Sequence, residues 1–315
     1  MKIIFFGTAD ISKYFLENTD TKHNVVCVVT MCDKPVGRNN KIKAPAVKEY
    51  AIKKNIPYIQ VDKFTDEIAE EIKKYNADVG VAVSFGKIIP EKVFNLPKYG
   101  CFNIHFSLLP QYRGASPVQQ ALLDGQEKTG VTAFFIEKGL DTGDIILQRE
   151  QNIDYKDTSD ILFNKLNLLG IKVMNEALEL LETGNFEAVK QTGEPSFCKI
   201  FKKEDGKIDW TKSATDIYNM YRGFYLWPKV FCTIADGRMA GKTMKIIECS
   251  PVEDSSDLQP GSVIEVKRGQ GFTVKCGKNA LFITKVQPES KAQMSAYDFV
   301  NGAGIKAASR FFLTI

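Results

Sequence analysis

An asparagine and a histidine two residues apart are the residues best placed to do chemistry. Asn103 and His105 lie in the apolar run 101–106, which predicts a β-strand. Side chains two apart on a strand point to one face of the sheet, and both lie near the strand's carboxyl end, where open α/β sheets bind ligands. A carboxamide and an imidazole at such a place can jointly donate hydrogen bonds to a developing oxyanion, and imidazole also exchanges protons near neutral pH.

The surroundings of this pair favour a functional site. Taken alone, N-x-H is more typical of a buried, satisfied histidine and an asparagine that ends a strand. Here the strand runs directly into residues 107–117, a loop interrupted by proline and glycine of the kind that closes over ligands. Asp141 lies in a second, glycine-bounded loop, which suits a carboxylate that orients or charges an imidazole.

Alternating strands and helices must position these groups. A long helix predicted over 159–182 is followed by Gly184, at a position where a glycine commonly terminates a helix. Such alternation predicts an α/β domain with a Rossmann-like, mostly parallel sheet over residues 1–184. Its predicted strands are 2–6, 25–30, 78–84, 101–106, 131–136 and 145–148, and its predicted helices are 46–54, 65–75 and 159–182.

The pattern changes after Gly184. Residues 185–205 are polar, contain Gly193 and Pro195 and show no sustained period, which predicts a linker. Residues 206–315 begin with a short helix near 213–221, followed by short strands separated by turns. Five short strands at this spacing predict a small β-barrel, with strands at 230–234, 244–249, 262–266, 272–276 and 281–286.

A longer motif surrounds the asparagine and histidine. N-I-H-F-S-L-L-P-Q-Y-R-G-A-S-P begins at Asn103, and G-L-D-T-G-D follows at 139–144. This order of rare residues resembles the signature of the 10-formyltetrahydrofolate-dependent formyltransferases. The resemblance implies formyl transfer from a folate carrier to an amine, without a metal, and catalytic roles for Asn103, His105 and Asp141. We expect Asn103 and a protonated His105 to stabilise the oxyanion, and Asp141 to orient His105 and raise its pKa.

The same resemblance implies where the folate co-substrate binds. In the family the folate lies against the loop that corresponds here to Ser107, Leu108, Leu109 and Pro110. The segment S-F-G-K-I-I-P at 84–90 is similar to the family's pterin-pocket region, which implies a binding role for Phe85, Gly86 and Ile88. The chain has no G-x-G-x-x-G motif, so a bound dinucleotide is not supported.

Further segments favour one branch of this family. These segments resemble the family members that formylate the methionyl group of initiator tRNA for translation initiation. This resemblance covers nearly the whole chain. In those members the C-terminal barrel is of the oligonucleotide-binding (OB) type, and an insertion after the second strand contacts the acceptor stem. The segments that carry it are F-F-G-T-A-D-I-S at 5–12, D-K-P-V-G-R at 33–38, D-G-K-I-D-W at 205–210 and W-P-K-V-F at 227–231.

Basic residues are concentrated in the two regions expected to contact tRNA. The expected tRNA-binding insertion, 33–43, contributes Lys34, Arg38, Lys41 and Lys43. Residues 1–200 hold 25 Lys and Arg against 26 Asp and Glu, whereas residues 201–315 hold 17 against 12. Basic side chains on a loop suit contact with phosphate groups, although without the resemblance a solvated basic loop would be the simpler explanation.

The composition limits the kinds of protein that this chain can be. Seven scattered cysteines form no C-x-x-C pair, which argues against a disulfide framework or a zinc site. Asp10 interrupts the first apolar run well before the length of a signal-peptide core or a membrane span. We therefore expect a cytoplasmic protein that does not enter a membrane, and a two-domain chain of 315 residues is compatible with a monomer.

Two other functions fit part of the pattern. The same three catalytic residues would serve to formylate a small amine, such as an amino sugar on a nucleotide, but the basic insertion and basic C-terminal part argue against it. A non-catalytic RNA-binding protein with a relic folate domain is the other alternative. The intact set of Asn103, His105 and Asp141 argues against that one.

Overall fold

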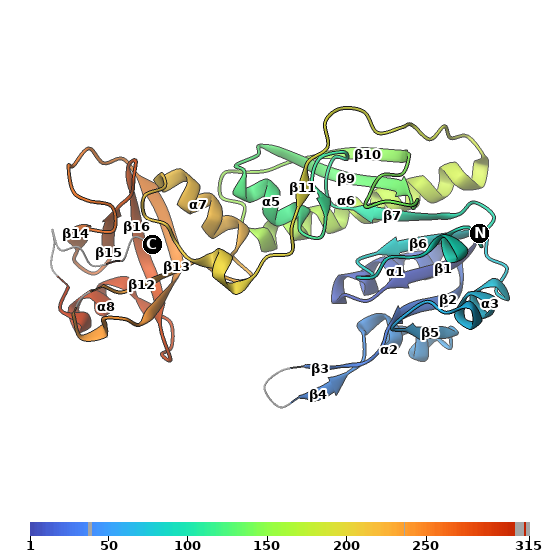
Figure 1. Ribbon diagram of the computed structural model, residues 1–315, viewed down its shortest axis with the longest axis horizontal. Coiled ribbons are helices and arrows are strands. Elements are labelled where there is room, and N and C mark those ends of the chain that lie inside the picture. The colour runs from blue at the N-terminus through green and yellow to red at the C-terminus, as the bar shows by residue number, and fades with distance from the viewer. Residues whose placement is uncertain (37–39, 236, 306–311, 313–315) are drawn as a thin grey trace. The chain divides into compact units, whose positions relative to one another are not determined.

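Seven strands form one sheet in the computed structural model of the chain, which describes residues 1–36, 40–235, 237–305 and 312 (Figure 1). Their order is β10–β9–β7–β6–β1–β2–β5. The last five are parallel to one another, whereas β9 is antiparallel to both β7 and β10. The prediction of a mostly parallel α/β sheet is therefore confirmed. The strands are β1 (Lys2–Gly7), β2 (Asn24–Met31), β5 (Tyr58–Val61), β6 (Val79–Val83), β7 (Cys101–His105), β9 (Lys128–Phe135) and β10 (Ile145–Asn152).

Helices cover both faces of this sheet. Ile4 and Phe6 of β1 pack in one cluster with side chains of α3 and α4, while Ile3 and Phe5 between them are equally buried. Alternating side chains that are all buried explain why the strands read as continuous apolar runs. The helices in this part of the sequence are α1 (Asp10–Lys22), α2 (Ala46–Lys54), α3 (Asp66–Lys73), α4 (Glu91–Phe94), α5 (Pro117–Leu123) and α6 (Ser159–Thr183), of which α5 falls almost entirely in the compact unit that contains the C-terminal part. No described helix is both long and apolar enough to cross a bilayer.

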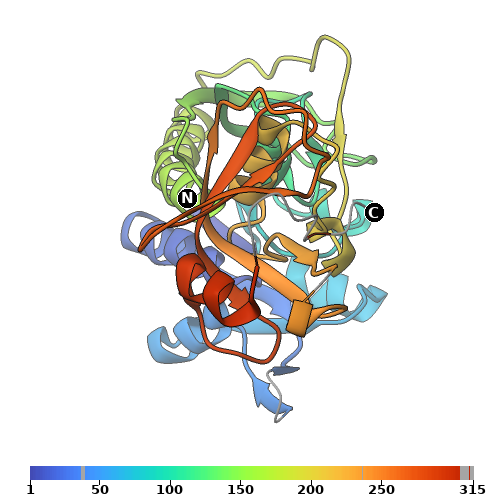
Figure 2. The same ribbon diagram turned by 90° about the vertical axis from the view of Figure 1, so that its left-hand side faces the viewer.

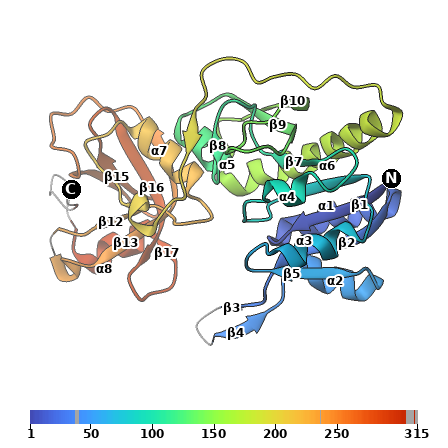
Figure 3. The ribbon, with the colours of Figure 1, turned by 45° about the vertical axis from the view of Figure 1, so that its right-hand side comes forward.

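Two short strand pairs extend this part of the chain. β3 (Lys34–Val36) and β4 (Lys41–Lys43) form a hairpin that projects from the carboxyl end of β2 (Figure 3). β8 (Arg113–Gly114) pairs in parallel with β11 (Phe197–Cys198). The segment predicted to be a plain linker thus carries β11, and it ends in the 3-10 turn η1 (Lys203–Gly206).

An antiparallel sheet dominates the C-terminal part (Figure 2, orange and red). Its order is β12–β13–β16–β15–β14, with β17 paired to β16, and these described strands follow an open path. All five predicted strands are present, whereas β17 and α8 have no counterpart in the prediction. The elements are α7 (Ala214–Gly223), β12 (Phe231–Thr233), η2 (Gly237–Met239), β13 (Thr243–Val252), β14 (Val263–Lys267), β15 (Gly271–Lys275), β16 (Ala280–Pro288), β17 (Met294–Ser295) and α8 (Ala296–Ala303).

The chain divides into two compact units built from interleaved segments. The first comprises residues 1–117, 128–152 and 164–198, and the second comprises 118–127, 153–163 and 199–315. The second unit has its own core, in which the buried Trp210 stacks on Phe312 and Phe312 stacks on Phe272.

Candidate active site

The predicted catalytic and folate-binding segments meet at one edge of the parallel sheet. Because β6 and β7 are parallel neighbours, with Ala82 opposite Asn103, the loops that follow them leave at the same edge. The first loop holds Phe85, Gly86 and Ile88, and the second holds residues 107–110. Open α/β sheets bind ligands at this edge, outside the carboxyl ends of the strands.

His105 ends β7 with a defined tautomer. Its ring is buried, and Nε2 lies 2.9 Å from the backbone oxygen of Tyr112. A carbonyl oxygen can only accept, so Nε2 carries the proton of the neutral ring and donates it. The other nitrogen, Nδ1, faces Oδ2 of Asp141 at 3.8 Å, which is too long for a direct hydrogen bond. Nδ1 is therefore the atom at which the ring gains or loses a proton.

Asp141 raises the pKa of His105, as predicted, but the net pKa does not support the protonated ring that we expected. Burial disfavours the charged imidazolium and lowers the pKa below its ordinary value of 6.5. The Asp141 carboxylate and the Tyr112 carbonyl each raise the pKa, but burial outweighs them. We therefore assign a neutral imidazole to His105 at pH 7.

Asp141 is aimed at His105 by its own backbone and by two neighbours. Its φ of +53° is left-handed, a conformation that aspartate tolerates better than most residues. Its Oδ2 accepts a hydrogen bond of 2.8 Å from the N–H of Gly114. Its backbone oxygen accepts another, of 2.9 Å, from Nε2 of Gln191. The carboxylate is thus held beside Nδ1 of His105.

Asn103 presents an uncommitted carboxamide on the same face of β7. Its backbone lies opposite Ala82 on one side and Phe134 on the other. The residue is half-buried, and its side chain forms no hydrogen bond with any other described residue. Its NH2 group is therefore free to donate to a ligand. Together, Asn103 and the pair of His105 and Asp141 supply a donor and a proton-exchanging group.

The loop after β7 is held from within the protein. Thr132 Oγ1 on β9 donates to the oxygen of Ser107 at 2.6 Å and accepts from the N–H of Leu109 at 3.2 Å. Gln148 Nε2 on β10 donates to the oxygen of Leu109 at 2.8 Å. Ser107 and Leu109 are buried, while Leu108 and Pro110 are half-exposed. The buried pair therefore fixes the loop, and the half-exposed pair is the part that a ligand can touch.

The loop after β6 offers both an apolar surface and open backbone groups. Phe85 is buried against Phe6 and Phe64, whereas the Ile88 side chain is 86% exposed. Gly86 has a left-handed φ of +82°. Residues 86–88 form no backbone hydrogen bond with any other described residue. An exposed isoleucine beside unpaired backbone donors and acceptors fits a flat heterocycle with a polar edge.

The hairpin gathers its lysines on one face. Lys34 lies directly opposite Lys43, and Lys41 lies two residues before Lys43 on the same strand, so all three share a face. Like charges directly opposite each other destabilise a strand pair, which a bound polyanion would relieve. An exposed Asp10 oxygen lies 3.5 Å from Lys43. The predicted Arg38 lies outside the described residues.

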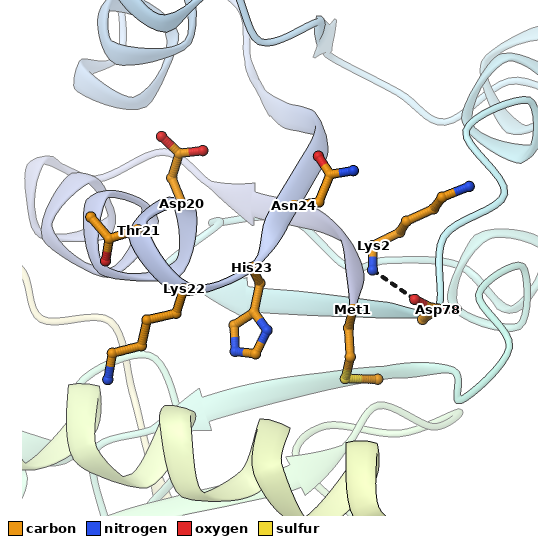
Figure 4. Close-up of a pocket in the computed structure, with 8 residues that line it drawn as sticks. All are labelled: Met1, Lys2, Asp20, Thr21, Lys22, His23, Asn24 and Asp78. Carbon is orange, nitrogen blue, oxygen red and sulfur yellow. Dashed lines mark hydrogen bonds between the residues drawn. The ribbon is translucent and has the colours of Figure 1, made fainter.

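A hollow of about 640 Å³ lies at the opposite edge of the sheet (Figure 4). It surrounds the amino ends of β1 and β2, where the backbone N–H of Lys2 donates to Asp78 at 2.6 Å. None of its lining residues belongs to the predicted site, so the hollow and the candidate active site are separate. It is lined by Met1, Lys2, Asp20, Thr21, Lys22, His23, Asn24 and Asp78.

Family models match nearly the whole chain. Residues 1–178 match the model described as formyl transferase, and residues 200–304 match that of the formyl transferase C-terminal domain. The chain belongs to the formyl transferase family. Among its relatives, a methionyl-tRNA formyltransferase from Endomicrobium trichonymphae is 49% identical, over 99% of this chain and 100% of the relative. Another of that name, from Clostridioides difficile, is 39% identical over 97% and 98%.

Solved structures share the fold of this formyl transferase. WlaRD, a sugar 3N-formyl transferase solved with dTDP and 5-N-formyl-THF, has a TM-score of 0.66 and 22% identity, over 93% of this chain and 99% of that one. HypX from Aquifex aeolicus, solved with tetrahydrofolic acid, has a TM-score of 0.64 and 18% identity, over 98% of this chain and 48% of that one. At such low identity these likenesses establish the fold alone.

Sequence reasoning missed the residues of this formyl transferase that hold the site together. Thr132 and Gln148 fix the loop after β7, and Gln191 holds the Asp141 loop. Thr132 carried a usable signal, because it is a polar residue inside an apolar strand, as are Asn103 and His105. Gln191 carried none, because it lies in a polar segment without a period.

Proposed function

We propose that this formyl transferase moves the formyl group of 10-formyltetrahydrofolate to the α-amino group of methionyl-initiator tRNA, for translation initiation. The observation that carries the proposal is the site itself, where an uncommitted Asn103 amide lies on the same face as a neutral His105 backed by Asp141. The shared name of full-length relatives at 39% and 49% identity supports the choice of acceptor.

The chemistry divides between a donor and a base. As the neutral amine attacks the formyl carbon, the formyl oxygen gains negative charge and accepts a hydrogen bond from the Asn103 amide. The attacking nitrogen becomes positive and gives a proton to Nδ1 of His105, because Nε2 is already protonated. Asp141 faces Nδ1 and stabilises the imidazolium that results. The proton then passes to the departing folate nitrogen as its bond to the formyl carbon breaks.

The two loops at the carboxyl edge are proposed to hold the folate. In the first loop, the buried Phe85 anchors Gly86 and the exposed Ile88, which offer an apolar side chain beside open backbone groups. Ser107, Leu108, Leu109 and Pro110 form the second loop. Structural neighbours solved with tetrahydrofolic acid and with 5-N-formyl-THF support this assignment. The folate supplies the formyl group, and these residues bind and orient it.

Two basic regions are proposed to hold the tRNA. One is the hairpin with Lys34, Lys41 and Lys43, to which Arg38 belongs in sequence. The other is the C-terminal part, proposed as an OB-like barrel over 206–315, after a catalytic domain over 1–184 and a linker over 185–205. Phe312 supports closure of that barrel, because it pairs with Ile234 and donates its N–H to the oxygen of Gly261 at 3.1 Å.

The proposal extends to location and assembly. Charged initiator tRNA is used in the cytoplasm, so we propose a cytoplasmic enzyme. One chain supplies all three proposed catalytic groups, so a monomer suffices for the reaction.

Formyl transfer to two acceptors tests the proposal. We expect the chain to transfer labelled formyl from 10-formyltetrahydrofolate to charged initiator tRNA and not to a nucleotide-linked amino sugar. The KM for tRNA should rise steeply with added salt, because phosphate contacts release counterions. Transfer to the amino sugar alone would overturn the choice of acceptor. Binding of tRNA with no transfer to either acceptor would favour a non-catalytic protein.

A further inference from the structure

One segment ties the loop that follows His105 to the loop that carries Asp141. We call residues 189–198 the strap. At its start, Val189 and Ile145 exchange two backbone hydrogen bonds of 2.8 and 2.9 Å. Towards its end, the oxygen of Ser196 accepts from the N–H of Arg113 at 2.9 Å, and β11 pairs with β8. The strap therefore runs from beside the Asp141 loop to the loop that follows β7.

Gln191 is the point of the strap at which both loops are held by one side chain. Its Nε2 donates to the backbone oxygens of Asp141 and Gly143, both at 2.9 Å. Its Oε1 accepts from Nε and Nη2 of Arg113, at 3.2 and 2.7 Å. Carbonyls only accept and guanidinium only donates, so the orientation of this amide is unambiguous. All of its principal hydrogen-bonding groups are used.

The strap also supports His105 indirectly, through Tyr112 on the Nε2 side of the ring. Ser196 Oγ accepts from the N–H of Tyr112 at 2.8 Å, and the Sγ of Cys198 lies 3.5 Å from the Tyr112 oxygen. That same oxygen accepts the Nε2 proton of His105. Tyr112 has a left-handed φ of +59°, which is costly for a bulky residue and needs such support. The tautomer of His105 thus depends on a residue that the strap holds.

We propose that Gln191 is a positioning residue for formyl transfer, which holds the left-handed Asp141 so that its carboxylate faces Nδ1 of His105. This inference rests on the proposed function and adds a residue to it. Gln191 acts through backbone atoms of the Asp141 loop and through Arg113, and touches neither His105 nor the Asp141 carboxylate. Its removal should therefore weaken the pairing of Asp141 with His105. The fold and the proposed folate-binding residues 107–110 should stay in place, because Thr132 and Gln148 hold that part of the loop independently of Gln191.

A displaced Asp141 carboxylate should be detectable in the pKa of His105, which depends on the charged groups around the ring. The Asp141 carboxylate faces the ring and favours the imidazolium. The Cys198 thiol lies nearby, but burial raises its pKa, so it stays neutral near pH 7. If Asp141 moves away, the pKa of His105 should fall further below its ordinary value.

Nuclear magnetic resonance titration of the histidine rings, together with kinetics, tests the inference on the full chain. The chain has only two histidines, so a His23→Gln variant assigns the signals. In Gln191→Met, which keeps the side-chain length but removes all four hydrogen bonds, we expect a lower pKa for His105. We also expect kcat to fall roughly 10- to 100-fold, as for a catalytic group misplaced by about 1 Å, with KM for both substrates nearly unchanged. Thr192→Ala, an exposed neighbour on the strap, is the matched control and should match the wild type.

The outcomes separate this inference from the proposed function. Full activity in Gln191→Met, or lost activity with an unmoved His105 pKa, would overturn the positioning role. If Gln191→Met does not fold, Gln191→Asn, which keeps the amide but shortens the side chain, is judged by the same two readouts. A wild-type chain that transfers no formyl would instead overturn the proposed function, whatever the titration gives.

Discussion

The chemistry proposed for His105 depends on which ring nitrogen carries a proton. The Tyr112 carbonyl settles that question by accepting from Nε2, which leaves Nδ1 beside Asp141 to exchange protons. Burial keeps the ring neutral, and Asp141 compensates for part of that burial. The pair therefore resembles other histidine–carboxylate arrangements in which the carboxylate stabilises the imidazolium formed during the reaction.

The pH dependence of kcat follows from this assignment. Because His105 must be neutral to take a proton, kcat should fall as the pH decreases through the pKa of His105. That pKa is lowered, so the loss should occur below pH 6.5, the ordinary value for histidine. We would measure kcat at saturating substrates rather than kcat/KM, because the free amine of the acceptor also titrates. A loss of kcat centred above pH 6.5 would contradict a neutral His105.

Among single residues, the sequence predicts the groups proposed to act on the substrate better than the residues that hold those groups in position. Asn103 and His105 stand out because they are polar residues in an apolar strand. The pKa of His105 could not be predicted, since it is a balance between burial and one carboxylate at 3.8 Å. Gln191 could not be predicted either, because its partners Arg113 and Asp141 lie 78 and 50 residues away in sequence.

Among the elements, the β3–β4 hairpin shows how a charged hairpin is anchored to the sheet. Lys48 of α2 donates to both oxygens of Asp33 at 2.9 and 2.8 Å, and also to Gln60. These bonds hold the residue that precedes β3 and lower the pKa of the Asp33 carboxyl. With Asp33 engaged by Lys48, the exposed lysines of the hairpin dominate the charge there.

Removing one hairpin lysine should weaken tRNA binding without changing the chemistry. In Lys41→Ala we expect a higher KM for tRNA and an unchanged kcat. The slope of log affinity against log salt should become shallower by roughly one, as for the loss of one phosphate contact. Lys53→Ala is the matched control, because Lys53 is exposed on α2 and outside the hairpin. Equal effects in both variants would argue that the hairpin makes no specific contact.

The elements with strong periodicity were predictable, and those defined by contacts were not. The predicted helix over 46–54 coincides with α2. The helix predicted over 159–182 ends one residue before the last residue of α6. β11 is two residues long and exists only because β8 lies beside it. β17 is equally short and depends on β16. Neither has enough length to show an alternating pattern.

On the scale of the whole molecule, each unit has its own sheet and its own core. The parallel strands of the first unit bring Asn103, His105 and both proposed folate-binding loops to one edge, and Asp141 reaches His105 from the loop between β9 and β10. The antiparallel sheet of the second unit contains the five strands predicted from the spacing of turns. The alternation of elements predicted both sheet types, but the interleaving of segments 118–127 and 153–163 with the C-terminal part depends on tertiary packing.

The most direct test of the account is the rate of formyl transfer after removal of the Asn103 amide or the His105 ring. For Asn103→Ala we expect kcat to fall roughly 100- to 1000-fold, the usual effect of losing one oxyanion donor, and for His105→Ala a loss at least as large. Asn55→Ala, at the exposed end of α2, should retain wild-type turnover. Near wild-type kcat in either Asn103→Ala or His105→Ala would contradict the assignment of the active site.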